Sequence, residues 1–154
     1  MLPSTGTYAL IFHLDERHRV RIGSLGTLEF EPGDWTYVGS GQGRGSTDLR
    51  GRLRRHLSTA ERGAENPHWH IDHLLDATRP RIKGAWLLPY DAECELARSL
   101  SRRAPGVPGF GCSDCDCESH LFHAGLRETS AAVAELKGGI FVPEPALRRW
   151  VSQR

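Results

Sequence analysis

Two tyrosines, an arginine and a histidine form a set of side chains that could attack a phosphodiester. Tyr8 and Tyr37 stand in apolar segments, and Arg52 and His56 stand four positions apart in a basic one. Phosphodiester hydrolysis needs a positioned base, a cation or metal on the scissile phosphate, and stabilisation of the leaving oxygen. Tyrosine, arginine, histidine and a carboxylate can supply these functions.

Two apolar strands are expected to carry the tyrosines. Residues 8–14 and 35–39 are apolar and β-prone, and residues 20–23 and 27–30 alternate in polarity around a turn. This pattern predicts two buried strands with a hairpin between them. We therefore expect the first half of the chain to open as an antiparallel meander.

A basic helix is expected to carry Arg52 and His56. Thr47 or Asp48 can cap a helix in which Leu49, Leu53 and Leu57 form an i, i+4 stripe. If this stripe faces the core, the side that carries Arg52, Arg55 and His56 points elsewhere. Residues that are four apart on a helix can reach the same point in front of the sheet.

Further elements follow the basic helix. Asn66 and Pro67 predict the start of a short helix. The remaining patterns predict that helix over residues 68–75, strands over 82–88 and 119–123, and helices over 91–102, about 128–136 and 145–151. The fold class is α/β of the α+β type, a small antiparallel or mixed sheet flanked by helices, with an inserted hairpin and a cysteine-rich C-terminal turn.

The composition is that of one folded domain, over residues 1–154. Hydrophobic residues make up 38% of the chain and charged residues 25%, which is unlike a disordered protein. No run approaches the ~18 apolar residues of a membrane span, and the N-terminus lacks a signal-peptide pattern. We therefore expect a cytoplasmic protein with no membrane partner.

A local excess of arginine survives the near-neutral net charge of +1. Residues 44–55 contain five arginines and only one acidic residue, Asp48. A solvated helix face explains Arg50 and Arg54, whereas Arg44 and Arg55 are candidates for contact with nucleic acid.

Four cysteines in a chain of this kind argue against a disulfide framework and for metal or redox chemistry. Cys115, Cys117 and His120 have tight ligand spacing, and either Cys94 or Cys112 could complete a tetrahedral structural zinc site. The alternative is that the cysteines are ordinary small core residues. A metal would brace a loop that is too rich in glycine and proline to hold itself.

The histidine-rich segment after residue 67 has a second candidate metal pair. His68 and Asp72 are separated by one helical turn, as are Trp69 and His73. Such a pair can bind a metal, but it can also simply form a hydrogen bond. A structural or substrate-positioning role is the preferred interpretation.

Several short strings together resemble the GIY-YIG nuclease superfamily. They are Gly6-Thr7-Tyr8, Tyr37-Val38-Gly39 and Arg52-x-x-x-His56, followed by strings typical of one uncharacterised branch at residues 68–72, 93–97 and 109–122. Members of that branch occur alone or fused to DNA-repair endonucleases. The resemblance covers a core over residues 6–123, with a C-terminal helical extension over 124–154.

The resemblance implies roles for the candidate residues. Tyr8 or Tyr37 would deprotonate or orient the attacking water, Arg52 would bind the scissile phosphate, and His56 would carry a proton. The family holds one divalent metal, Mg²⁺ or Mn²⁺, through a glutamate on the helix after the third strand. Glu93 is the preferred ligand here, and Glu95 is the alternative.

The function that the resemblance implies is a metal-dependent endonuclease that hydrolyses phosphodiester bonds in DNA, in repair or in processing of single-stranded or branched ends. Two alternatives remain: a non-catalytic nucleic-acid-binding module on the same fold, and a nuclease directed at RNA. Cleavage assays distinguish these three functions.

Overall fold

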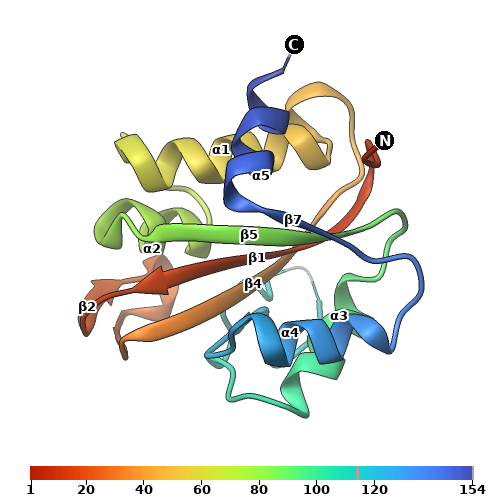
Figure 1. Cartoon of the computed structure of the whole chain (residues 1–154). Coiled ribbons are helices and arrows are strands. Elements are labelled where there is room, and N and C mark those ends of the chain that lie inside the picture. Colours follow the sequence, from red (N-terminus) through yellow and green to blue (C-terminus); the bar gives the residue numbers. More distant parts are fainter. Residues whose placement is uncertain (114, 154) are drawn as a thin grey trace.

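The computed structural model describes residues 1–113 and 115–153, and in this part of the chain a five-stranded sheet carries helices on both faces (Figure 1). Asp114, which belongs to one of the family-like strings, and Arg154 lie outside the described residues. The strand order is β6-β4-β1-β5-β7, and each neighbouring pair is antiparallel. The strands are β1 (Gly6–Leu14), β4 (Gly33–Gly41), β5 (Arg81–Leu88), β6 (Leu121–Phe122) and β7 (Ile140–Pro143). The predicted fold class is confirmed.

The helices divide between the two faces of the sheet. α1 (Leu49–Arg62), α2 (His70–Thr78) and α5 (Glu144–Ser152) contribute to one hydrophobic core, and α3 (Glu93–Ser101) and α4 (Leu126–Ala134) contribute to the other. Strand β1 serves both cores because successive side chains of a strand point to opposite faces. Leu10 and Phe12 pack in the first core and Ala9 packs in the second.

The inserted hairpin is confirmed, but the expectation of one continuous meander is wrong. β2 (His18–Arg21) and β3 (Thr27–Phe30) form a separate two-stranded sheet, with the short 3₁₀ helix η1 (Gly23–Leu25) between them. β1 instead pairs with β4 along its whole length and with β5 on its other edge. No edge of β1 is left for the hairpin strands.

Helix α1 follows the sequence pattern closely. It begins after a second 3₁₀ helix, η2 (Gly45–Thr47), and the Asp48 carboxylate caps it by accepting the Gly51 N–H at 2.7 Å. Leu49, Leu53 and Leu57 are buried against the sheet. The expected cap and apolar stripe are both present.

Helix α2 begins later than Asn66 and Pro67 predict. Its N-cap is Trp69, because the Asp72 carboxylate reaches back to accept the N–H groups of His68 and Trp69 at 3.2 and 3.1 Å. An acidic side chain in the first turn can satisfy the free donors of a helix start as well as a capping residue does. The turn that precedes α2 is therefore held by a side chain of the helix itself, Asp72.

The C-terminal part of the chain contains a strand that the sequence analysis missed. β7 pairs with β5, and its sequence Ile-Phe-Val-Pro does not alternate in polarity and ends in proline, so no strand pattern marks it. Helix α5 then returns over the face that carries α1, as Figure 1 shows. None of the helices in the described part of the chain has the length and apolar character that a membrane crossing requires.

Candidate active site and metal centre

Tyr8 and Tyr37 lie on neighbouring strands and on the same face of the sheet. Tyr8 on β1 is paired with Gly39 on β4, so Tyr37 is its diagonal neighbour, with the ring centroids 6.3 Å apart. A Cβ atom on Gly39 would overlap the Tyr8 hydroxyl. Glycine at this position therefore makes room for the Tyr8 ring to lie across the strand.

His56 is buried directly behind Tyr8. The leucine stripe predicted that His56 points away from the core together with Arg52 and Arg55, and this prediction is wrong: His56 is 1% exposed. The core-facing stripe of a helix is wide enough to include i+3 as well as i+4 positions, so His56 faces inward beside Leu53. Its Nε2 lies 2.5 Å from the Tyr8 hydroxyl.

Burial sets the protonation of this pair. It raises the pKa of Tyr8 well above its ordinary value and lowers the pKa of His56 to about 4. At neutral pH, Tyr8 is therefore protonated and His56 is uncharged. One hydrogen bond joins the Tyr8 hydroxyl to Nε2 of His56, and the hydroxyl is its donor in the tautomer that carries the imidazole proton on Nδ1.

Arg52 and Glu93 face the tyrosines from two helices. Arg52, Glu93 and both tyrosines line one cavity of about 230 Å³, which opens between the sheet, α1 and the start of α3. The charge of Glu93 adds to burial in raising the pKa of Tyr37, whereas Arg52 acts to lower it. The cavity thus combines one cation, one carboxylate and two phenol groups.

The structure distinguishes between the two candidate glutamates. Glu93 is the first residue of α3 and its side chain is 30% exposed, at the wall of the cavity. Glu95 is exposed and is not among the residues that line this cavity. Glu93 is therefore the carboxylate that can act together with Arg52 and the tyrosines.

Arg44 and Arg55 lie away from the cavity lining. Arg55 donates a hydrogen bond to the buried Asp72 carboxylate at 2.9 Å, and its guanidinium carbon lies 5.3 Å from the centroid of the Trp69 ring. Arg44 is exposed just before η2. Arg52, which also stacks on Trp69 at 4.8 Å, connects this basic surface to the cavity.

The histidine-rich segment, for which a structural or substrate-positioning role was the preferred interpretation, forms part of the cavity wall. His68, Trp69 and His70 all line it, and Nδ1 of His70 accepts the N–H of Gly111 at 2.8 Å. The family-like string at residues 68–72 was the signal that could have found them. His68 precedes α2, so the helical spacing to Asp72 on which the metal pair depended is absent.

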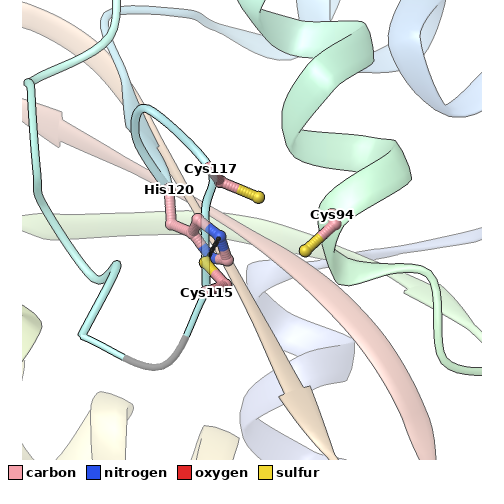
Figure 2. A group of neighbouring side chains, drawn as sticks. All are labelled: Cys94, Cys115, Cys117 and His120. Atoms are coloured by element: carbon pink, nitrogen blue, oxygen red, sulfur yellow. Dashed lines mark hydrogen bonds between the residues drawn. The ribbon is translucent and has the colours of Figure 1, made fainter.

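A second cluster of ligands lies beside α3. Cys94, Cys115, Cys117 and His120 place their ligand atoms within 4.8 Å of one another, and Figure 2 shows Cys94 reaching from the helix toward the three residues of the loop. This set could bind a metal ion. Cys112, the alternative fourth ligand, instead places its thiol 3.3 Å from the Phe110 carbonyl oxygen.

His120 connects the cysteine cluster to the cavity. Its Nε2 lies 3.3 Å from the Cys115 sulfur, and its Nδ1 lies 3.2 Å from both the Val38 carbonyl oxygen and a carboxylate oxygen of Glu93. The imidazole is 1% exposed. One buried ring therefore contacts a cluster ligand on one side and the cavity carboxylate on the other.

Comparison with known families places these features in one group of proteins. The family model described as Domain of unknown function DUF123 matches residues 7–140. The chain belongs to this family. The match includes the residues of the cavity and of the cysteine cluster, and ends where β7 begins. No curated protein and no solved structure matches the chain.

Proposed function

We propose that this protein is a GIY-YIG-type endonuclease that hydrolyses phosphodiester bonds in DNA, in repair or in processing of single-stranded or branched ends. The observation that carries the proposal is the convergence of Tyr8, Tyr37, Arg52 and Glu93 on one cavity from four different elements. The superfamily-like strings of the sequence supply these same residues. The basic surface beside Arg52 gives a path for the phosphate backbone.

Arg52 is the phosphate-binding residue in this proposal. Its guanidinium stacks on Trp69 at the edge of the cavity, which fixes its plane while its charge remains available. A planar guanidinium with several N–H donors suits the oxygens of a phosphodiester. It would hold the scissile phosphate and offset the negative charge that develops during hydrolysis.

Tyr8 and His56 form the proton path. Tyr8 is protonated, so it acts as a relay: its oxygen accepts a proton from the attacking water as its own proton passes to Nε2 of His56. Tyr37, whose pKa is also raised by burial, orients the water or the phosphate through its hydroxyl. His56 would hold the proton only transiently, because its pKa is about 4, and would return it through Tyr8 to the leaving oxygen, which restores the neutral imidazole.

The residues of the cavity fit a divalent ion of the Mg²⁺ or Mn²⁺ class. These ions prefer oxygen ligands and are often held by one or two carboxylates together with waters and substrate phosphates. Glu93 is the carboxylate among the residues that line the cavity, whose volume of about 230 Å³ gives room for solvent and a phosphate group. When bound, the ion would act as a Lewis acid on the phosphate.

The cysteine cluster fits a different metal. Three thiolates and one imidazole form the donor set of a structural zinc site, and such sites are tetrahedral and closed to substrate. We propose Zn²⁺ here, where it would fasten the glycine- and proline-rich loop to α3. The two metals would thus have separate ligands and separate tasks.

Cleavage assays test the proposed function. Labelled single-stranded, duplex and flapped DNA and matched RNA are incubated with Mg²⁺ or Mn²⁺ and the wild type or Tyr37→Phe, Arg52→Ala or Glu93→Gln. We expect metal-dependent cutting of DNA by the wild type and large losses in all three variants. Arg62→Ala, which removes an exposed arginine from the end of the same helix, is the matched control for Arg52→Ala.

The same assays separate the alternatives. A wild type that binds nucleic acid but never cuts it would support a non-catalytic binding module. Cutting confined to RNA would support an RNA-directed nuclease. Activity that survives all three substitutions would contradict the site assignment even if cutting is real.

A further inference from the structure

We propose that His120 is a positioning residue that links the cysteine-cluster metal to Glu93, so that occupancy of the cluster controls divalent-metal binding in the cavity. This inference rests on the proposed function, since it assigns Glu93 to the metal. It goes further because it makes the structural metal a condition for a working active site.

The first link is through the imidazole ring. With Nε2 turned toward the cluster, Nδ1 carries the hydrogen and faces the Val38 carbonyl and the Glu93 carboxylate, both at 3.2 Å. A metal-bound histidine characteristically donates its other N–H to a carboxylate or carbonyl, which fixes both partners. A metal held by Nε2 would thereby fix the orientation of the Glu93 side chain.

The second link is through the chain itself. Cys94, which Figure 2 shows on the helix, follows Glu93 directly in the first turn of α3. A metal bound to its sulfur would therefore also hold the backbone that carries Glu93. The two links hold Glu93 at its two ends, one at a carboxylate oxygen and the other at the backbone.

The backbone of His120 is itself hydrogen-bonded on both sides, to β4 and to Phe110. Val38 donates its N–H to the His120 carbonyl oxygen at 2.8 Å, and the His120 N–H is donated to the Phe110 carbonyl oxygen at 2.9 Å. Val38 follows Tyr37 on β4. The residue whose ring contacts Glu93 is therefore hydrogen-bonded to the strand that supplies Tyr37.

The decisive variant is His120→Cys. It retains a fourth metal ligand, because four cysteines form a normal zinc site, but it removes the N–H that faces Glu93. We expect one zinc per chain in the purified variant, a folded protein by circular dichroism, and Mn²⁺ binding about 10- to 100-fold weaker than in the wild type. Mn²⁺ binding is measured from the electron paramagnetic resonance signal of the free ion. The Glu93→Gln variant shows how much of the bound Mn²⁺ requires Glu93.

A chelation experiment keeps the proposal testable if His120→Cys loses its zinc. Wild-type protein stripped of zinc should show the same weakening of Mn²⁺ binding, and restoring zinc should reverse it. Cys112→Ser, which changes the cysteine outside the cluster, should retain both zinc and Mn²⁺ affinity.

Two results would overturn the inference. One is wild-type Mn²⁺ affinity in zinc-loaded His120→Cys, and the other is an affinity that zinc removal leaves unchanged. Because binding is measured without substrate, a wild type that binds Mn²⁺ through Glu93 but cuts nothing would contradict the proposed nuclease and leave this link standing. The two failures are therefore distinguishable.

Discussion

His56 illustrates how burial of one residue sets the chemistry of its neighbour. Its pKa is about 4 because burial disfavours the charged imidazole, and the nearby Arg52 and Arg55 act in the same direction while Asp72 opposes them. An uncharged imidazole can accept the Tyr8 proton at neutral pH, which a protonated one cannot. The inward position of His56 is thus essential to the proposed proton path.

The low pKa of His56 predicts a pH dependence of stability. Unfolded His56 binds a proton below about pH 6.5, whereas the folded residue does so only near pH 4. Its contribution to stability is therefore complete above pH 6.5 and is lost as the pH falls toward 4, by roughly 3 kcal/mol in total. Urea unfolding across this range should show a shallower decline for His56→Gln than for the wild type. Identical slopes would contradict the buried, neutral assignment.

Gly39 gives a prediction about the Tyr8 ring. In Gly39→Ala the added methyl group overlaps the Tyr8 hydroxyl and must displace it from His56. We expect a loss of about 1–3 kcal/mol in the free energy of unfolding from overpacking. We also expect cleavage to fall further than the smaller folded fraction accounts for. Val38→Ala is the matched control, because it creates a cavity on the opposite face of the same strand and leaves Tyr8 in place. Equal cleavage in both variants would contradict the requirement for Tyr8.

At the scale of elements, the turn before α2 depends on one carboxylate. Asp72 is fully buried and accepts hydrogen bonds from two backbone N–H groups and from Arg55. These bonds hold the segment from His68 to His70 against the cavity. The start of α2 is therefore part of the site and not only of the fold.

Removing the Asp72 carboxylate should loosen this turn. Asp72→Ala leaves donors without partners in a buried region, so we expect a loss of about 2–4 kcal/mol in the free energy of unfolding by urea. Asp72→Asn retains an acceptor oxygen and should lose less. Asp15→Ala removes a carboxylate whose side chain is 81% exposed and should change stability by no more than ~0.5 kcal/mol. An Asp72→Ala variant as stable as Asp15→Ala would contradict the account of the turn.

Local patterns predicted most elements but not all of their partners. The continuous apolar run of β1 and the leucine stripe of α1 are local signals, and both elements form where expected. The pairing of β1 with β4 across the hairpin and the addition of β7 to β5 depend on contacts between distant parts of the chain. Such contacts leave no periodic trace in a single sequence.

At the scale of the whole molecule, the fold brings the two candidate metal sites into contact through α3. From the sequence alone, either Cys94 or Cys112 could be the fourth ligand of the zinc site. Likewise, either Glu93 or Glu95 could be the carboxylate that binds the divalent metal. The packing of α3 against β4 and the cysteine loop brings Cys94 into the cluster and Glu93 to the cavity. Spacing could nominate these residues, but only the tertiary arrangement distinguishes them.

The most direct test of the central claim compares Glu93→Gln with Glu95→Gln in the DNA cleavage assay with Mn²⁺. The two substitutions make the same chemical change two positions apart on α3, one in the cavity and one on the exposed surface. A metal ligand is worth several kcal/mol of transition-state stabilisation, so we predict a loss of about 100-fold or more for Glu93→Gln and near wild-type cleavage for Glu95→Gln. Equal activity in the two variants, or a loss confined to Glu95→Gln, would contradict the assigned active site.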